Sequence, residues 1–112
     1  MIRVRALHLL AQVALRTRAP RDAKAMIDAC SRFLPRLRSG DEARRLADAL
    51  DGSGTCLSRA LVVTSLLDGA AVVVGVEPGA PVGPMVHAHA WVEYKGRPLR
   101  EADPRGDEIV RL

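Results

Sequence analysis

Apolar residues recur every three or four positions along the first half of the chain, a spacing that predicts a series of helices. The first predicted helix starts near Ile2, and its pattern fades over residues 17–20. Pro20 suits the first turn of a second helix, where a backbone N–H is not needed, and Pro35 limits that helix. The apolar positions are Ile2, Ala6, Leu9, Leu10 and Val13 in the first helix and Ala23, Met26, Ile27, Cys30, Phe33 and Leu34 in the second.

Two further helices are predicted in the middle of the chain. Gly40 and Asp41 can cap the third helix. A polar, glycine-rich loop over residues 51–54 follows it, and Thr55 is suited to cap a fourth helix. The positions expected to face inward in the third helix are Ala43, Leu46, Ala47 and Leu50, and the fourth helix carries Cys56, Leu57, Leu61 and Leu66.

The hydrophobic period changes after Asp68 and Gly69. Residues 70–76 form a continuous apolar run rich in valine, which is typical of a strand buried on both faces. Helices followed by strands, without an internal repeat, predict an α+β fold in which a small antiparallel sheet packs against the fourth helix. The later elements are expected to be a loop over 77–84, a strand over 86–94, a turn at 95–96, a strand over 97–101 and a short strand over 108–112.

A chain of 112 residues suits one small domain with a single hydrophobic core. Its composition, 48% apolar and 27% charged, is that of a folded protein. No apolar run approaches the roughly 18–20 residues that a membrane helix needs. The N-terminal segment is interrupted by Arg3, Arg5 and His8 and does not read as a signal peptide. We therefore expect a cytoplasmic protein whose two cysteines are reduced.

The formal net charge of +4 comes mainly from arginines in the first half of the chain. They fit either a solvated helical surface or a surface that attracts an acidic peptide or protein. Nucleic acid is not expected as a partner, because the charge is scattered over several helices without stacking aromatic residues. These arginines are Arg3, Arg5, Arg16, Arg18, Arg21, Arg32, Arg36, Arg38, Arg44 and Arg45.

Cys56 is the first candidate for chemistry. It follows the glycine-rich loop and lies at the start of the fourth predicted helix. The free N–H groups and the dipole at a helix N-terminus favour negative charge, so a thiol there is biased toward the reactive thiolate. Cys30, by contrast, fits an apolar helix face and is expected to be a buried core thiol.

A pair of histidines in the predicted strand over 86–94 offers a partner for this thiol. An imidazole beside a thiol completes the minimal apparatus of a cysteine nucleophile, although both histidines can also be structural. Strand alternation places His87, His89, Trp91 and Glu93 on one face and Val86, Ala88, Ala90, Val92 and Tyr94 on the other.

An acid to orient the imidazole is available in Glu101 or Asp103, and the hairpin register decides whether either can reach it. If the loop is the two residues 95–96, His89 faces Ala102 and both acids point to the other face. If the loop has three residues, His89 faces Glu101 directly and Asp103 lies diagonal to it. A catalytic acid therefore requires the bulged, three-residue loop.

These residues resemble the transglutaminase-like leader peptidases of lasso-peptide biosynthesis, which cut the leader from a ribosomal precursor before a partner cyclase closes the ring. The resemblance implies a cysteine protease with a transglutaminase-like, papain-like core over 52–112, preceded by a helical part over 1–51 within the same domain. The matching segments are residues 56–67, 72–76 and 87–96, the last with the run His-Ala-His-Ala-Trp-Val-Glu.

The resemblance assigns the nucleophile to Cys56 and the base to His89, with His87 as a neighbour and Glu101 or Asp103 as the orienting acid. It implies no cofactor and no metal. The implied partners are the leader of the precursor peptide and the partner cyclase. The helices over 1–50 do not resemble the leader-recognition domain that some members carry, so a separate leader-recognition protein is expected.

Three alternatives remain open at this stage. Acyl transfer to an amine would begin with the same thioester as hydrolysis, so the residues do not separate the two reactions. A non-catalytic adaptor would use its basic helices to bind an acidic partner. A metal site from Cys56, His87 and His89 is the weakest, because neither a second cysteine nor the usual ligand spacing supports it.

Overall fold

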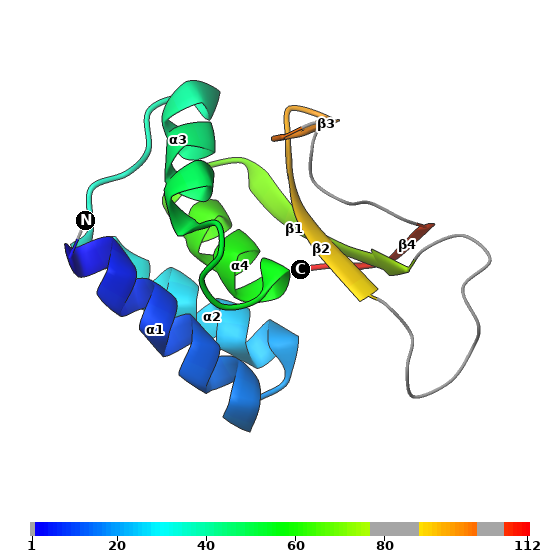
Figure 1. Ribbon diagram of the computed structural model, residues 1–112, viewed down its shortest axis with the longest axis horizontal. Helices are drawn as coiled ribbons and strands as arrows, with labels where there is room; N and C mark the ends of the chain where they lie inside the picture. Colours follow the sequence, from blue (N-terminus) through cyan, green and yellow to red (C-terminus); the bar gives the residue numbers. More distant parts are fainter. Residues whose placement is uncertain (1, 77–87, 101–106) are drawn as a thin grey trace.

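The fold consists of helices packed on one face of a four-stranded antiparallel sheet, which confirms the prediction of an α+β protein (Figure 1). The computed structural model describes residues 2–76, 88–100 and 107–112. No helix among these residues is long and apolar enough to cross a membrane. The helices are α1 (Ile2–Thr17), α2 (Pro20–Cys30), the short 3₁₀ helix η1 (Ser31–Phe33), α3 (Gly40–Leu50) and α4 (Cys56–Leu66), and the strands are β1 (Ala70–Val76), β2 (Ala88–Tyr94), β3 (Arg97–Pro98) and β4 (Asp107–Arg111).

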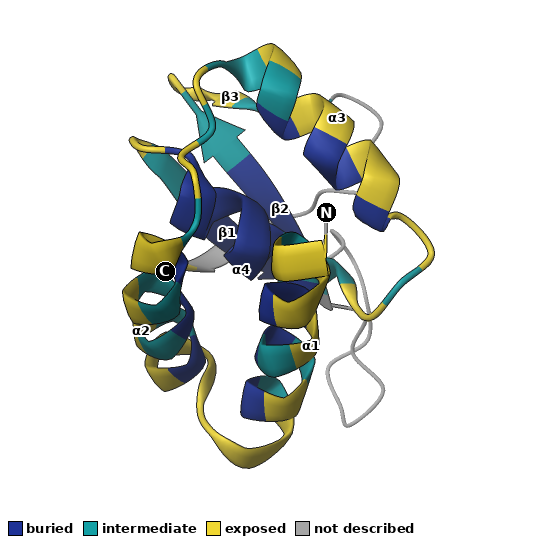
Figure 2. Ribbon diagram, turned by 90° about the vertical axis from the view of Figure 1, so that its left-hand side faces the viewer, coloured by how far each residue is buried: buried dark blue, intermediate teal, exposed yellow. Residues whose placement is uncertain are grey.

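Helix α4 is the central element, because it contacts the other three α-helices and both inner strands (Figure 2). Its side chains are buried around most of the helix, and Leu61, Val62 and Leu66 are each at most 1% exposed. Such a helix is stable only when other elements surround it. Each fully buried leucine or valine contributes about 1.5–3 kcal/mol. The core therefore holds the helix that begins at Cys56 firmly in place.

Capping hydroxyl groups set the starts of α3 and α4. Thr55 caps α4 as predicted, and its Oγ1 accepts the N–H of Ser58 at 3.1 Å. The predicted cap of α3 at residues 40–41 is wrong, because Ser39 takes that role and its Oγ accepts the N–H of Glu42 at 3.2 Å. All four residues predicted to face inward from α3 are buried: Ala43, Leu46, Ala47 and Leu50.

Helix α1 forms where it was predicted, but the apolar residues that predicted it lie largely on its outer face. Ile2 is 86% exposed, Leu9 62% and Val13 50%. The helix carries a second apolar face, on which alanines allow close approach to α2 and α4. The residues of α1 that are buried are Leu7, His8, Ala11 and Ala14.

The apolar stripe of α2 is confirmed except at its end. Ala23 and Ile27 are fully buried, while Met26 and Cys30 pack partly against the core. Beyond Cys30 the chain tightens into the 3₁₀ helix η1, which changes the rotation per residue. Phe33 therefore leaves the stripe and is 83% exposed.

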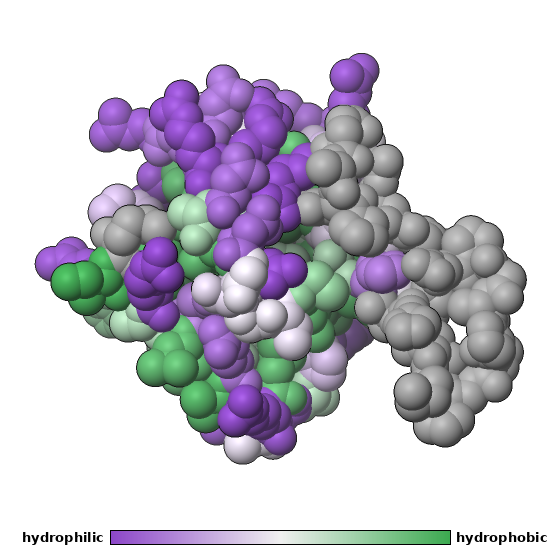
Figure 3. Space-filling model, viewed as in Figure 1, coloured by the Kyte–Doolittle hydropathy of each residue, from purple (hydrophilic) through white to green (hydrophobic). Residues whose placement is uncertain are grey.

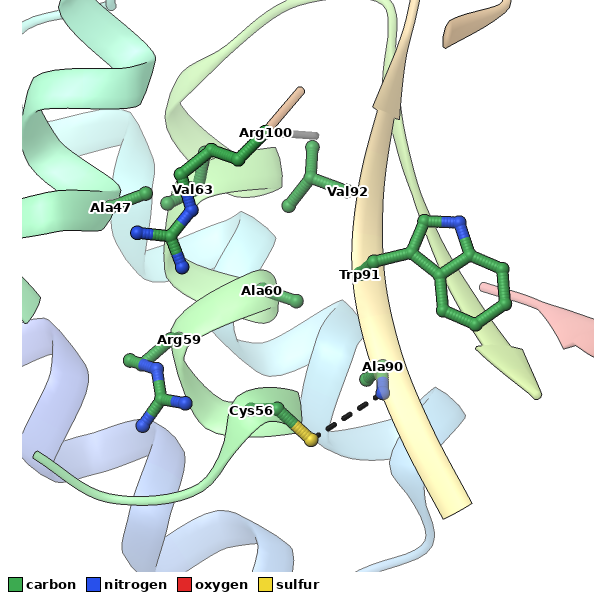
Figure 4. A pocket seen from close by; sticks show the side chains of 9 residues that line it. All are labelled: Ala47, Cys56, Arg59, Ala60, Val63, Ala90, Trp91, Val92 and Arg100. Atoms are coloured by element: carbon green, nitrogen blue, oxygen red, sulfur yellow. Dashed lines mark hydrogen bonds between the residues drawn. The ribbon is translucent and has the colours of Figure 1, made fainter. Parts of the chain in front are cut away.

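The sheet has the strand order β3-β2-β1-β4. Val72 and Val73 of the inner strand β1 have no exposed surface, which confirms the prediction of a strand buried on both faces. Ala90 and Val92 of β2 join the core beneath the helices, whereas Trp91 points away from α4 (Figure 4). Strand β4 lies close to the predicted short strand, and the predicted loop over 77–84 is outside the described residues.

The β2–β3 hairpin has a two-residue loop. Tyr94 pairs with Arg97, and both loop residues, Lys95 and Gly96, have positive φ angles of 54° and 76°. Two consecutive positive φ angles are typical of a type I′ turn, whose twist matches that of the flanking strands. The three-residue bulged loop is therefore not formed. Strand β3 covers only two residues and is shorter than the strand predicted over 97–101.

Candidate active site

Cys56 is the first residue of α4, as predicted, and it is half-buried. A capping box fixes the backbone before it: Ser58 N–H donates to Thr55 Oγ1 at 3.1 Å, and Thr55 N–H donates to Ser58 Oγ at 3.0 Å. The N–H groups at the start of a helix have no intrahelical acceptor, and the helix dipole is positive there. This position therefore favours negative charge on the thiol and on any oxygen bound beside it.

The thiol also accepts a hydrogen bond from the sheet. The N–H of Ala90 in β2 donates to Cys56 Sγ at 3.4 Å (Figure 4). Toward β3, the carbonyl of Val92 accepts the N–H of Leu99 at 2.8 Å. Alternate residues of an antiparallel strand direct their backbone groups to the same neighbour, so the N–H of Ala90 points to this edge too. Strand β3 ends at Pro98, and further along the same edge the N–H of Ala90 donates to the thiol.

The same contact brings the backbone of His89 close to the thiol. His89 precedes Ala90 in β2, pairs with Gly75 of β1 and is half-buried. The Cα atom of a residue lies about 2.4 Å from the next backbone nitrogen. Given the 3.4 Å contact at Ala90, the His89 Cα lies at most about 6 Å from Cys56 Sγ. Strand alternation places His89 on the same face as Trp91, so it is the His89 backbone that this contact brings close to the thiol.

The other predicted site residues, His87, Glu101 and Asp103, lie outside the described residues. The two-residue loop removes the bulged register that would have set His89 directly opposite Glu101. The pairing of β3 with β2 is described for Arg97 and Pro98 only. The choice between Glu101 and Asp103 stays a prediction.

Cys56 lines a small pocket of about 50 Å³ bounded by α3, α4 and β2 (Figure 4). A cavity needs roughly 10–15 Å³ of such space to hold one water molecule, so this pocket has room for a few waters or a small group. Two arginine side chains also line it, and one of them, Arg100, is paired with the carboxylates of Asp48 and Asp51. The lining residues are Ala47, Cys56, Arg59, Ala60, Val63, Ala90, Trp91, Val92 and Arg100.

The two pocket arginines were not among the predicted site residues. Arg59 follows Cys56 by three positions, a spacing that places both on the same side of a helix and could have identified it. Its Nη1 donates to the carbonyl of Ser53 at 2.9 Å and braces the loop before α4. Arg100 had no comparable signal, because only the folded hairpin brings it to the pocket.

Arg100 ties the β2–β3 hairpin to α3. Its guanidinium donates to Asp48 at 2.9 Å and to both carboxylate oxygens of Asp51 at 2.9 and 3.0 Å. The hydrogen bond from Arg100 lowers the pKa of Asp51 below its ordinary value; burial acts in the opposite direction, and the charges of Arg100 and Arg59 lower the pKa further. This anchor holds one wall of the pocket against the loop that leads to Cys56.

Metal ligands do not gather in the part of the chain that the structure describes. Within it, no group of three or more histidine, cysteine, aspartate or glutamate side chains is arranged to hold a metal ion. The described geometry at Cys56 is that of a thiol at a helix N-terminus with a backbone donor from a strand.

Brief treatment with iodoacetamide near neutral pH is expected to modify Cys56 at least about tenfold faster than Cys30. The helix N-terminus and the Ala90 N–H both favour the thiolate of Cys56, and the thiolate is the form that reacts. Cys30 packs partly against the core and lacks these donors among the described contacts. Mass mapping of the digested protein measures both rates, and faster labelling of Cys30 would remove Cys56 as the nucleophile.

Comparisons with known proteins agree with this geometry at the level of the family. The chain matches neither a curated protein nor a solved structure. One family model matches, and it covers residues 1–111. That match includes the helices over the first half, the Cys56 helix and the sheet. The chain belongs to the transglutaminase-like superfamily.

Proposed function

We propose that this protein is a cysteine peptidase that removes the leader from a ribosomally made lasso-peptide precursor. The transglutaminase-like superfamily generally contains cysteine proteases and acyl-transferring enzymes, which supports thiol chemistry at Cys56. The observation that carries the proposal is the hydrogen bond from Ala90 to Cys56 Sγ, because it brings the backbone of the neighbouring His89 to within about 6 Å of the thiol. The run from His87 to Glu93 supports the narrower assignment by its resemblance to the leader peptidases.

The first half of the reaction forms a thioester. The imidazole of His89 takes the proton of the Cys56 thiol, and the thiolate attacks the carbonyl carbon of the scissile peptide bond. The new C–S bond leaves negative charge on the carbonyl oxygen, which the N–H of Cys56 and the N-terminus of α4 stabilise. The C–N bond then breaks, and His89 returns its proton to the departing amine.

The second half of the reaction regenerates the enzyme. His89 takes a proton from water, and the resulting hydroxide equivalent attacks the thioester carbon. The C–S bond breaks, the leader leaves as a carboxylic acid, and Cys56 recovers its proton from the imidazolium. Glu101 or Asp103 orients the imidazole and stabilises its positive charge without taking the proton itself.

The mass of the products tests this function and separates it from acyl transfer. A lasso-precursor peptide incubated with the chain should yield two fragments whose masses together exceed that of the precursor by one water. Transfer to an added primary amine would instead give an amide at the new C-terminus of the leader. Failure to change the precursor under conditions in which the thiol is reactive would favour the adaptor.

The exposed surface of α1 supports a separate leader-recognition protein as a partner. Apolar side chains lie at the surface over this helix beside hydrophilic ones (Figure 3). Ile2, Leu9 and Val13 form an outward stripe, and α1 contains no acidic residue. A second copy of this surface would bring like charges together, so we propose a partner that presents apolar side chains among carboxylates. The exposed arginines of α1 are Arg3, Arg5 and Arg16.

Leader cleavage by the isolated chain is expected to be slow and to rise at least about tenfold when a leader-recognition protein is added. Leu9→Glu should weaken that association about tenfold, because it places a carboxylate in the exposed apolar stripe. Ala25→Glu adds the same charge at an exposed position of α2 and serves as the control. Titration of binding at rising salt should show weakening, since screening acts over about 8–10 Å at ordinary ionic strength.

Full cleavage by the isolated chain, independent of salt, would contradict the need for this partner. Equal effects of Leu9→Glu and Ala25→Glu would contradict the choice of surface while leaving the cleavage chemistry untouched. After recognition and cleavage, a partner cyclase would take the released core peptide.

A further inference from the structure

His8 is a buried histidine directly behind the start of the Cys56 helix. It lies on the inner face of α1 and is 3% exposed. Its Nε2 lies 2.9 Å from the hydroxyl of Ser58, and its Nδ1 lies 3.4 Å from the side-chain nitrogen of Gln12. Ser58 is the residue that forms the capping box with Thr55. The imidazole is thus connected to the turn that positions Cys56.

One arrangement of protons satisfies all of these hydrogen bonds. Ser58 Oγ donates its one proton to the carbonyl of Thr55 at 2.9 Å and accepts the N–H of Thr55 at 3.0 Å. Its remaining lone pair accepts from His8, so Nε2 carries the proton. Nδ1 is then the acceptor for the amide of Gln12. Each donor in this series of hydrogen bonds has an acceptor when the imidazole is neutral. A second proton, on Nδ1, would face the amide N–H of Gln12.

At Gly54 the loop before α4 packs closely against the side chains of His8, Gln12 and Ser58. Its φ angle is +61°, and a Cβ atom there would lie 2.5 Å from Ser58 Oγ and 2.9 Å from His8 Nε2. A side chain at this position would also lie 3.0 Å from the amide nitrogen of Gln12. Only glycine combines this backbone conformation with this approach. The loop, the capping box and His8 therefore form one packed unit.

The surroundings of His8 oppose a positive charge. Burial lowers its pKa below the ordinary value of 6.5, and two cations act in the same direction, Arg59 from α4 and Arg5 from α1 itself. A histidine with a lowered pKa binds its proton more readily in the unfolded chain than in the folded protein. Stability therefore rises as the pH rises toward and through 6.5, and it falls when the pH drops toward the lowered value.

We propose that neutral His8 is a positioning residue for Cys56, which holds the N-terminus of α4 through Ser58 and whose protonation in acid loosens that terminus. The carbonyl carbon of Thr55 is bonded to the nitrogen of Cys56, so the bonds between Ser58 and Thr55 also set the direction of the Cys56 N–H. The inference uses the proposed function only in taking Cys56 as the nucleophile.

The alkylation rate of Cys56 tests this proposal without any substrate. The rate is measured by mass mapping between pH 5 and pH 8.5 for the unaltered protein and for His8→Gln. Glutamine can donate the same bond to Ser58 but does not titrate. Above pH 7 the unaltered protein and His8→Gln should react at rates within about threefold of each other. Between pH 7 and pH 5 the ratio of the unaltered rate to the His8→Gln rate should fall by at least a further threefold. Any effect of pH on Cys56 or His89 themselves is common to the two proteins and cancels in the ratio of their rates.

A second variant removes the bond altogether. His8→Leu should label Cys56 at least about tenfold more slowly than His8→Gln at pH 7.5, where both variants lack a titrating group. Cys30 in the same sample reports whether the fold has opened, because its labelling should stay slow in a folded variant. A ratio that does not change with pH, or equal rates in folded His8→Leu and His8→Gln, would overturn the proposal.

Nitrogen-15 NMR of the unaltered protein provides a measurement that does not depend on how the variants fold. The His8 ring should titrate below 6.5 and show the Nε2–H tautomer at neutral pH, with His8→Gln used to assign its signals. A pKa at or above 6.5, or a proton on Nδ1, would overturn the arrangement. Loss of leader cleavage alone would not bear on it, so this inference and the proposed function fail separately.

Discussion

Replacement of Cys56 by alanine is expected to abolish leader cleavage, with a loss of at least about a thousandfold. The thiolate forms the covalent bond to the leader, and no described residue beside it offers a second nucleophile of comparable strength. Cys56→Ser should be nearly as inactive, although it preserves the size of the side chain and the start of α4. Mass spectrometry of a lasso precursor, incubated with each variant and a leader-recognition protein, measures the rates.

The second cysteine provides the matched control for this prediction. Cys30→Ser changes the same atom in a half-buried residue of α2, away from the Cys56 pocket, and should keep activity within about threefold. Substantial cleavage by Cys56→Ala would contradict the proposed mechanism. Loss of activity in Cys30→Ser with unchanged labelling of Cys56 would indicate a structural effect instead.

Replacement of His89 by alanine is expected to lower the cleavage rate by about a hundredfold to ten-thousandfold, the range for loss of a general acid–base group. Its Cα lies at most about 6 Å from Cys56 Sγ, which follows from the bond between Ala90 N–H and the thiol at 3.4 Å. His87→Ala should retain much of the activity and is the matched control, since it removes the same side chain two residues away. Activity in His89→Ala together with its loss in His87→Ala would reverse the assignment.

The two candidate acids are distinguished in the same assay. Glu101→Gln and Asp103→Asn each remove one negative charge with little change in size. The variant of the orienting acid should lose less activity than His89→Ala, because this acid positions the imidazole without transferring the proton. If both variants keep full activity, neither acid orients His89. The two-residue hairpin loop makes this experiment necessary, since the register no longer favours Glu101.

Local patterns were sufficient to predict most of the secondary structure. The helical spacing in α2 and α3, the valine run of β1 and the Lys95–Gly96 turn all correspond to elements of the fold. Thr55 was identified as the cap of α4 because capping depends on a side chain and a backbone N–H only three residues apart. The same local signals placed Cys56 at a helix N-terminus, which is the part of the site that depends least on tertiary contacts.

Tertiary structure decided the features that depend on distant neighbours. Helix α1 has two apolar faces, and only packing against α2 and α4 selected the one that includes His8 and left Leu9 outside. The contact between Ala90 and Cys56 joins residues 34 positions apart, and no local spacing indicates it. Arg100 reaches the pocket through the hairpin for the same reason. Sequence therefore determined the elements and the candidate nucleophile, whereas packing, which maximises burial over the whole chain, determined what surrounds that nucleophile.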